Sequence, residues 1–104
     1  MRNIDVHELQ RLLTQPGVTV LDVRTEEELF AARLPGATHI PLQELPMRYV
    51  ELNPAQHIAV LCHHGVRSEM AARFLERNGF QHVSSVDGGL DAWSMHVDPT
   101  VPRY

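Results

Sequence analysis

Two apolar runs of strand length, each followed by the start of a helix, most constrain how this chain can fold. VTVLDV (18–23) and HIAVLC (57–62) are apolar at nearly every position. Runs of this kind are typical of strands that are buried on both faces. Thr25 and Glu28 have the spacing of a capping box after the first run, and residues 67–78 have helical spacing after the second. The sequence therefore predicts two strand–helix units around a buried sheet.

The N-terminal third of the chain carries further helix signals. Asp5 and Glu8 repeat the capping pattern and predict a short helix through Leu13, which TQPG (14–17) ends. The helix that follows the first strand must stop before Pro35, because a proline disfavours the helical conformation in the residue before it. Two short helices are therefore expected on either side of the first strand.

Weaker signals predict the remaining elements. The apolar face of the 67–78 helix is predicted to hold Met70, Ala71, Phe74 and Leu75, and Gly79 is predicted to close that helix. We also expect a brief strand at 37–40, a helical segment at 42–52 interrupted near Pro46, a strand at 82–86, a turn at 88–89 and a helical turn at 90–94.

Alternating strands and helices predict right-handed β–α–β crossovers and a mainly parallel sheet. In such sheets ligands bind beyond the carboxyl ends of the strands. Cys62 is the only cysteine, and it ends one predicted strand and precedes one predicted helix. The sequence therefore places its one potential thiol nucleophile at the edge where a parallel sheet binds ligands.

The amino-acid composition limits the classes of protein to which this chain can belong. The chain has 104 residues, 43% hydrophobic and 21% charged, which is typical of one globular domain with one core over residues 1–104. A net charge of −4 and scattered arginines argue against nucleic acid as a partner. One cysteine excludes an intramolecular disulfide and suits a reducing compartment. No signal-like or membrane-spanning run is present, so we expect a cytoplasmic protein without membrane contact.

The segment CHHGVRS (62–68) combines a sulfur with groups that hold anions. A short loop containing glycine, between a strand and a helix, can turn backbone N–H groups inward beside the positive end of the helix. Gly65 allows the unusual backbone angles, Arg67 adds a fixed positive charge, and Ser68 adds a hydroxyl donor or a helix cap. Thiolate is the reactive form of cysteine and is favoured in such surroundings. We therefore interpret Cys62 as a nucleophile.

Three other interpretations of Cys62 stay open at this point. A cysteine that ends an apolar strand is often a small buried hydrophobe. His63 and His64 are metal-ligand types, but three consecutive residues rarely converge on one ion, so we expect no metal and no other cofactor. Tyrosine-phosphatase loops resemble Cys-x5-Arg, and the Cys-x4-Arg spacing here should be too tight for a phosphoryl group. The other histidines are interpreted as surface or half-buried polar residues: His7, His39, His57, His82 and His96.

Motifs along almost the whole chain resemble those of rhodanese-like domains. CHHGVRS is similar to that family's active-site loop in the Cys-x-x-Gly-x-Arg-Ser form of single-domain members. LDVRTEEELFAARLPGATHIPL (21–42) resembles its first signature, and VDGGLDAW (86–93) resembles its closing segment. The chain departs from the family pattern away from the nucleophile, where we expect changes in local packing and turn hydrogen bonds. These departures are Ala32, Arg33, Leu34 and His39.

The resemblance implies a doubly wound α/β fold with a mainly parallel five-stranded sheet and helices on both faces. It implies a transferase of the thiosulfate sulfurtransferase type. Cys62 would take sulfane sulfur from a small anionic donor such as thiosulfate and pass it, through a persulfide, to cyanide, a thiol or a protein acceptor. The loop amides would stabilise the persulfide, and Arg67 would help to hold the anion. The implied loop residues are His63, His64, Gly65, Val66, Arg67 and Ser68.

Residues outside the loop are predicted to support it. Asp22, Arg24 and Glu28 are expected to brace the loop through an ion-pair network rather than to take part in the chemistry. Trp93 is expected in the core rather than as a substrate platform. A second function stays open, a non-catalytic rhodanese-like binding or regulatory module, which an unreactive Cys62 would favour. The sequence assigns no oligomeric state.

Overall fold

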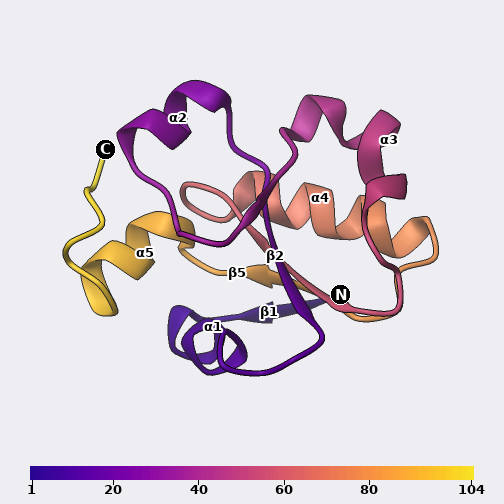
Figure 1. Cartoon of the computed structure of the whole chain (residues 1–104), viewed down its shortest axis with the longest axis horizontal. Helices are drawn as coiled ribbons and strands as arrows, with labels where there is room; N and C mark the ends of the chain where they lie inside the picture. Colours follow the sequence, from indigo (N-terminus) through magenta and orange to yellow (C-terminus); the bar gives the residue numbers. More distant parts are fainter.

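A five-stranded parallel sheet forms the centre of the protein in a computed structural model that describes residues 1–104. Its strands are β1 (Arg2–Ile4), β2 (Val18–Asp22), β3 (Thr38–His39), β4 (His57–Leu61) and β5 (Val83–Val86). They lie in the order β1-β5-β4-β2-β3, and every pairing is parallel. The predicted parallel α/β fold is therefore confirmed (Figure 1).

Helices cover both faces of this sheet. The α-helices are α1 (Val6–Leu12), α2 (Glu26–Ala31), α3 (Leu45–Arg48), α4 (Val66–Arg77) and α5 (Gly89–His96), and two short 3-10 helices are η1 (Leu42–Glu44) and η2 (Tyr49–Glu51). Buried residues of α1 and α5 pack on one face, and those of α3 and α4 pack on the other. No helix is both long enough and apolar enough to cross a membrane.

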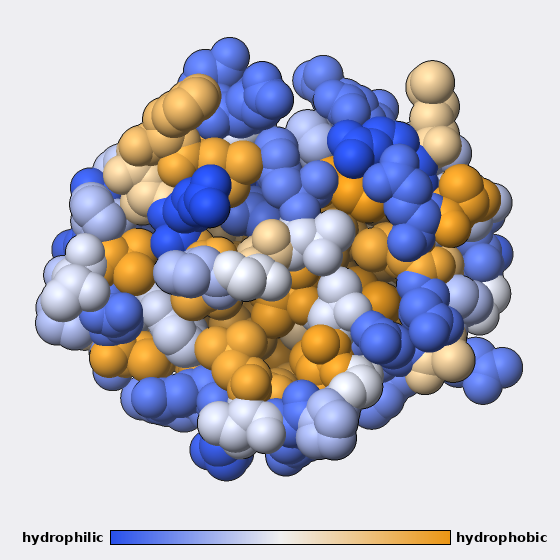
Figure 2. Space-filling view, viewed as in Figure 1, coloured by the Kyte–Doolittle hydropathy of each residue, from blue (hydrophilic) through white to orange (hydrophobic).

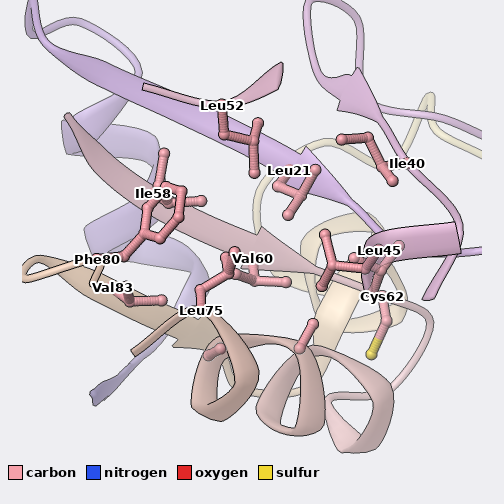
Figure 3. Close-up of a cluster of buried hydrophobic side chains, with 13 residues drawn as sticks. Leu21, Ile40, Leu45, Leu52, Ile58, Val60, Cys62, Leu75, Phe80 and Val83 are labelled. Carbon is pink, nitrogen blue, oxygen red and sulfur yellow. The ribbon is translucent and has the colours of Figure 1, made fainter. Parts of the chain in front are cut away.

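The sheet divides the buried side chains into two clusters, where the sequence predicted one core. The first has 13 residues, among them Leu45 of α3, Leu75 of α4 and Cys62 (Figure 3). The second has 12 residues, among them Leu9 of α1 and Trp93 of α5. Trp93 is buried in this cluster, so its predicted place in the core is confirmed. A sheet that is apolar on both faces necessarily separates its two apolar layers.

The predicted caps form as hydrogen-bonded turns. Asp5 accepts a hydrogen bond from the backbone N–H of Glu8 at 2.8 Å and begins α1. Thr25 and Glu28 form both halves of a capping box at the start of α2. These local contacts satisfy N–H groups that a helix start otherwise leaves without partners. The short-range signals in the sequence therefore fix where these two helices begin.

One strand was missed, and one local prediction was partly wrong. The strand β1 was missed, because Arg2 and Asn3 are exposed and only pairing with β5 identifies them as a strand. On α4 the predicted Ala71 and Leu75 are buried, but Met70 is 57% exposed and the small residues Ser68 and Ala72 are buried in addition. Small residues let a helix approach its sheet closely, which a pattern of large apolar residues does not show. The helical segment predicted at 42–52 is divided directly before Pro46, which lies in the first turn of α3, so its predicted interruption is confirmed.

His57 is more buried than the sequence predicted. It begins β4 and is 6% exposed, and its ring stacks on His82 with the ring centroids 3.7 Å apart. Its Nε2 lies 2.7 Å from the hydroxyl oxygen of Ser84. Burial lowers the pKa of His57, and the nearby charges of His82 and Arg2 lower it further, against an opposing contribution from Glu8. These effects disfavour the charged imidazolium in the folded protein.

We predict that the free energy of unfolding decreases as the pH falls below about 6.5. The folded-state pKa of His57 is lowered, so the unfolded chain takes up the proton first and protonation favours unfolding. Urea unfolding between pH 7.5 and 5 measures this slope, and His57→Gln should make it shallower. Substitution of the exposed His7 by Gln is the matched control. An identical slope in wild type and His57→Gln would contradict the prediction.

Candidate functional site

The sulfur of Cys62 lies where β4 ends, at the mouth of the loop that leads into α4 (Figure 3). Two backbone N–H groups donate to Sγ, that of Gly65 at 3.0 Å and that of Ser68 at 3.3 Å. The residue is 1% exposed. The loop therefore closes around one sulfur atom with part of the predicted ring of amides. The other loop amides, those of His63, His64, Val66 and Arg67, make no hydrogen bond to Sγ.

Gly65 and Ser68 give the loop its shape. Gly65 has φ of 115°, a conformation that favours glycine, and it is the residue from which α4 begins. The hydroxyl of Ser68 donates to the carbonyl of Gly65 at 3.0 Å and lies 2.8 Å from the hydroxyl of Ser85 on β5. The Ser68 side chain therefore ties the loop to the sheet, and its backbone N–H is the group that faces the sulfur.

The start of α5 packs against the loop and donates hydrogen bonds to it. The carbonyl of Cys62 accepts from the N–H of Leu90 at 2.8 Å, and the carbonyl of His63 accepts from the N–H of Asp91 at 3.1 Å. Gly89, at φ 57°, lies so close to both carbonyl groups that a Cβ atom would overlap them. The predicted turn at 88–89 is therefore the N-terminal part of a helix whose first N–H groups hold the Cys62 loop in place.

Arg67 faces α2 rather than the sulfur. Its Nη1 and Nη2 donate to the two carboxylate oxygens of Glu28 at 2.6 and 2.8 Å. The hydrogen bonds from Arg67 hold the pKa of Glu28 well below its usual range, against an opposing effect of burial, and bonds from Tyr104 and Thr25 add to the effect. The structure brings Glu28 and Arg67 together as a brace between α2 and the loop. A role of Arg67 in holding an anionic donor stays a prediction.

Asp22 and Arg24 form a fully buried ion pair at the end of β2, and Arg24 Nη1 also donates to the carbonyl oxygen of Glu28 at 3.4 Å. Arg24 Nη2 donates to Asp22 Oδ2 at 2.7 Å, and Nε donates to Oδ1 at 3.0 Å. His39 Nε2 lies 2.6 Å from the carbonyl oxygen of Arg24. This contact shows what one departure from the family pattern does locally. A buried ion pair that is joined by several hydrogen bonds is rigid, so the Asp22–Arg24 pair fixes the end of β2 beside the loop.

Tyr104 is the site residue that the sequence analysis missed. Its hydroxyl donates to Glu28 Oε2 at 2.7 Å and accepts from Arg24 Nη1 at 2.9 Å. It therefore links the Asp22–Arg24 pair to the Glu28–Arg67 pair, where the sequence predicted a network of Asp22, Arg24 and Glu28. The segment after α5 has no periodicity, and nothing in its residues indicates that the chain returns to the site. Only the fold shows it.

The imidazole of His63 lies between two other rings. Tyr104 stacks on it with centroids 3.8 Å apart and 7° between the planes, and His64 lies 3.9 Å away at 34°. Burial and the neighbouring His64 lower the pKa of His63. His64 is exposed and lies 4.0 Å from Asp91. No three His, Cys, Asp or Glu side chains lie close enough together to hold a metal ion.

A cleft opens on one side of the loop, between α2 and η1. It has a volume of about 330 Å³ and reaches Arg67 from the surface. Six of its nine lining residues are polar or charged, and Figure 2 shows hydrophilic residues between α2 and α3 at the top of the view, beside hydrophobic residues over both helices. The lining includes Thr25, Glu26, Glu27, Gln43 and Glu44. Small polar molecules can therefore approach the brace that holds the loop.

Comparison with known families decides the relationship. The model of the Rhodanese-like domain family matches residues 5–96, which include the whole loop, both ion pairs and α5. The chain belongs to the rhodanese-like domain family. The predicted resemblance is therefore confirmed, and the family includes proteins named as sulfurtransferases.

Relatives of this rhodanese-like chain agree on the fold. It is 42% identical to the "Putative sulfur carrier protein YrkF" of Bacillus subtilis over 82% of the chain and 46% of that protein, so it spans about half of YrkF. It is 33% identical to the "Thiosulfate sulfurtransferase GlpE" of Vibrio cholerae over 88% of the chain and 86% of that protein. The crystal structure of a rhodanese-like domain protein from Staphylococcus aureus superposes with a TM-score of 0.85 at 31% identity, covering 100% of this chain and 99% of that one.

We predict that Gly89→Ala lowers the free energy of unfolding of this rhodanese-like domain by about 3 kcal/mol or more. The added Cβ would overlap the backbone carbonyls of Cys62 and His63, and the residue would also be held at positive φ. Gly36→Ala is the matched control, because Gly36 has φ of 84° and open space around its Cβ position. It should cost about 1–2 kcal/mol, the backbone strain alone. Urea unfolding measures both, and equal costs would contradict the proposed contact.

Proposed function

We propose that this protein is a sulfurtransferase that carries sulfane sulfur on Cys62. One observation supports this above all: Sγ accepts hydrogen bonds from the backbone N–H groups of Gly65 and Ser68, in a loop that closes around a single sulfur atom. Donors aimed at one point stabilise negative charge that develops there. The names of GlpE and YrkF agree with sulfur as the transferred group.

The proposed reaction has two steps. The Cys62 thiolate attacks the outer sulfur of thiosulfate, the S–S bond of the donor breaks, and sulfite leaves with the electron pair. A persulfide forms on Cys62, with its negative charge on the terminal sulfur. The acceptor, cyanide or a thiolate, then attacks this terminal sulfur, and the Cys62 thiolate is released. No oxidant is required, because the sulfane sulfur keeps its oxidation state.

The protein contributes position and charge to these steps. The N–H groups of Gly65 and Ser68 donate to the anionic sulfur, and the first turn of α4 adds its positive end. Glu28 holds Arg67 at the side of the loop that borders the polar cleft. An anionic donor that reaches the Arg67 guanidinium would accept hydrogen bonds from the same N–H groups as Glu28. The donor pocket is proposed to lie between Arg67 and Cys62.

One observation favours the second candidate, a non-catalytic binding module. Cys62 is 1% exposed, so a donor cannot reach its sulfur while the loop keeps the observed conformation. A protein whose loop never opens would bind partners without sulfur chemistry. The two candidates differ in one measurable property, the uptake of sulfur by Cys62.

We predict that wild-type protein gains the mass of one sulfur atom when it is incubated with thiosulfate, and that Cys62→Ser gains none. A serine oxygen matches the shape of the thiol but cannot form a persulfide, so thiosulfate:cyanide activity should fall to background. Electrospray mass spectrometry and a thiocyanate assay measure these outcomes. Cyanide should remove the added mass from the wild type.

Ser85→Ala is the control for this experiment, because it changes the support of the loop without changing the sulfur. It should still gain one sulfur atom. Retained thiosulfate:cyanide activity in Cys62→Ser would overturn the role of Cys62. A wild type that gains no mass with any small sulfur donor would favour the binding module.

We predict no Cys62-dependent hydrolysis of an aryl phosphate. The loop has four residues between Cys62 and Arg67, and two of its N–H groups already lie 3.0 and 3.3 Å from a single sulfur atom. A phosphoryl group needs room for three oxygens. Release of p-nitrophenol from its phosphate ester measures this, with Cys62→Ser as the control. Turnover that the substitution abolishes would contradict the size argument.

A further inference from the structure

The cleft between α2 and η1 adjoins the buried sulfur of Cys62. Val23 lines this cleft and belongs to the buried cluster that contains Cys62, and Leu42 lines it and packs against the same cluster. Arg67, from the Cys62 loop itself, lines the cleft as well. A second cleft beside the loop is lined by no member of that cluster. Of the two clefts, the first therefore lies against the surroundings of the sulfur.

Negative charge exceeds positive charge in this cleft. Its lining holds three glutamates, and Arg67 is its only basic residue. Both terminal nitrogens of Arg67 already donate to Glu28. Glu44 is paired with an arginine of α3, but the exposed Glu26 and Glu27 take part in no ion pair. The cleft therefore carries unpaired negative charge, which attracts cations and repels anions.

Two apolar side chains project into solvent from the helices beside the cleft. Phe30 of α2 is 92% exposed, and Met47 of α3, the helix that directly follows η1, is 85% exposed. Figure 2 shows hydrophobic residues over both helices and hydrophilic residues between them. Aromatic residues and methionine are enriched where proteins bind one another. Neither side chain lines the cleft itself, so a molecule that contacts both must be larger than the cleft.

Charge decides which kind of molecule suits this surface. Thiosulfate is a dianion, so the unpaired carboxylates of the cleft oppose its approach, although solvent screens exposed charges and the effect slows a small anion rather than excluding it. A molecule with a positively charged surface is steered toward the cleft by the same charges. The apolar side chains beside the cleft add contacts that only a protein-sized partner can use. The surface therefore complements a basic protein better than a small anion.

We propose that this surface docks a basic, partly apolar segment of a partner protein whose thiol is the sulfur acceptor of Cys62. Basic side chains of the segment pair with Glu26 and Glu27, and its apolar side chains pack on Phe30 and Met47. The inference rests on the proposed sulfur transfer and names the class of acceptor. The partner's thiol loses its proton to solvent, and the thiolate attacks the terminal sulfur of the Cys62 persulfide. The S–S bond breaks, and its electron pair returns to Cys62 as the thiolate.

Two thiol reagents of similar size and opposite charge measure the charge selectivity of the cleft. Trimethylammonium-ethyl methanethiosulfonate is a cation and sulfonatoethyl methanethiosulfonate is an anion, and both form a mixed disulfide with Cys62, the only cysteine. The ratio of their rates cancels any opening of the loop that both reagents need. Glu26→Gln/Glu27→Gln should lower the cation-to-anion ratio about threefold or more at low ionic strength. In about 1 M salt the variant and wild type should agree.

Glu69→Gln/Asp87→Asn is the matched control, because both residues line the second cleft and the variant loses the same total charge. It should change the ratio of rates less than about twofold, since the reagents do not cross that cleft. An unchanged ratio in Glu26→Gln/Glu27→Gln would overturn the proposal. An equal change in both variants would also overturn it, because the total charge of the protein would then explain the selectivity.

Peptide binding tests the docking surface without sulfur chemistry. The probe is a labelled peptide with arginines and leucines around a serine that replaces the acceptor cysteine, and a second peptide has glutamates for the arginines. Fluorescence anisotropy should show tighter binding of the arginine peptide, and Phe30→Ser and Met47→Ser should each weaken it about threefold or more. Met95→Ser, at a methionine of α5 that is 53% exposed, is the matched control and should stay within twofold of wild type. Equal affinity for the two peptides, or unchanged binding in Phe30→Ser and Met47→Ser, would overturn docking.

The proposed function and the proposed partner fail separately. If wild type takes up no sulfur from thiosulfate, the sulfurtransferase proposal fails, and the reagent ratio and peptide binding still decide whether the cleft docks a basic segment. If sulfur uptake is normal, a cysteine-containing arginine peptide should receive sulfur from the Cys62 persulfide faster than the glutamate peptide. This preference should shrink in Glu26→Gln/Glu27→Gln. Equal rates with the two peptides in wild type would overturn the acceptor class alone.

Discussion

The hydrogen bonds between the first N–H groups of α5 and the carbonyls of Cys62 and His63 are the contacts on which the site depends. They turn these two carbonyls away from the sulfur, so that the N–H groups of Gly65 and Ser68 can point toward it. Gly89 makes this approach possible because it has no Cβ. A loop of seven residues thus takes its conformation from a helix more than twenty positions later in the chain.

Two ion pairs that differ in their exposure to solvent lie beside this loop. Asp22 and Arg24 are fully desolvated and paired, so they act as a rigid part of the strand end. Glu28 and Arg67 are partly exposed and lie at a polar cleft, where a solute can compete for their hydrogen bonds. Tyr104 joins the two pairs through one hydroxyl. The Asp22–Arg24 side of the site is therefore rigid, whereas the hydrogen bonds on the Glu28–Arg67 side can be exchanged with a solute.

Near-complete burial of the sulfur has a functional consequence. A buried thiol is protected from most reagents, but it reacts only as fast as its surroundings open. The contacts that hold the loop come from Glu28 of α2, from the first N–H groups of α5 and from the side chain of Tyr104 after α5.

The sequence by itself determined the strands β2 and β4, the capped helices α1 and α2, the parallel sheet and the position of Cys62 at the edge where the carboxyl ends of the strands lie. Those features depend on local hydrogen bonds and on hydrophobic periodicity, which neighbouring residues encode. Only the tertiary structure decided that Arg67 pairs with Glu28, that Ser68 rather than Met70 faces inward, and that Tyr104 reaches the loop. Tyr104 and Glu28, for example, are 76 positions apart in the sequence. No local pattern predicts such contacts, because they form only once the sheet has brought the residues together.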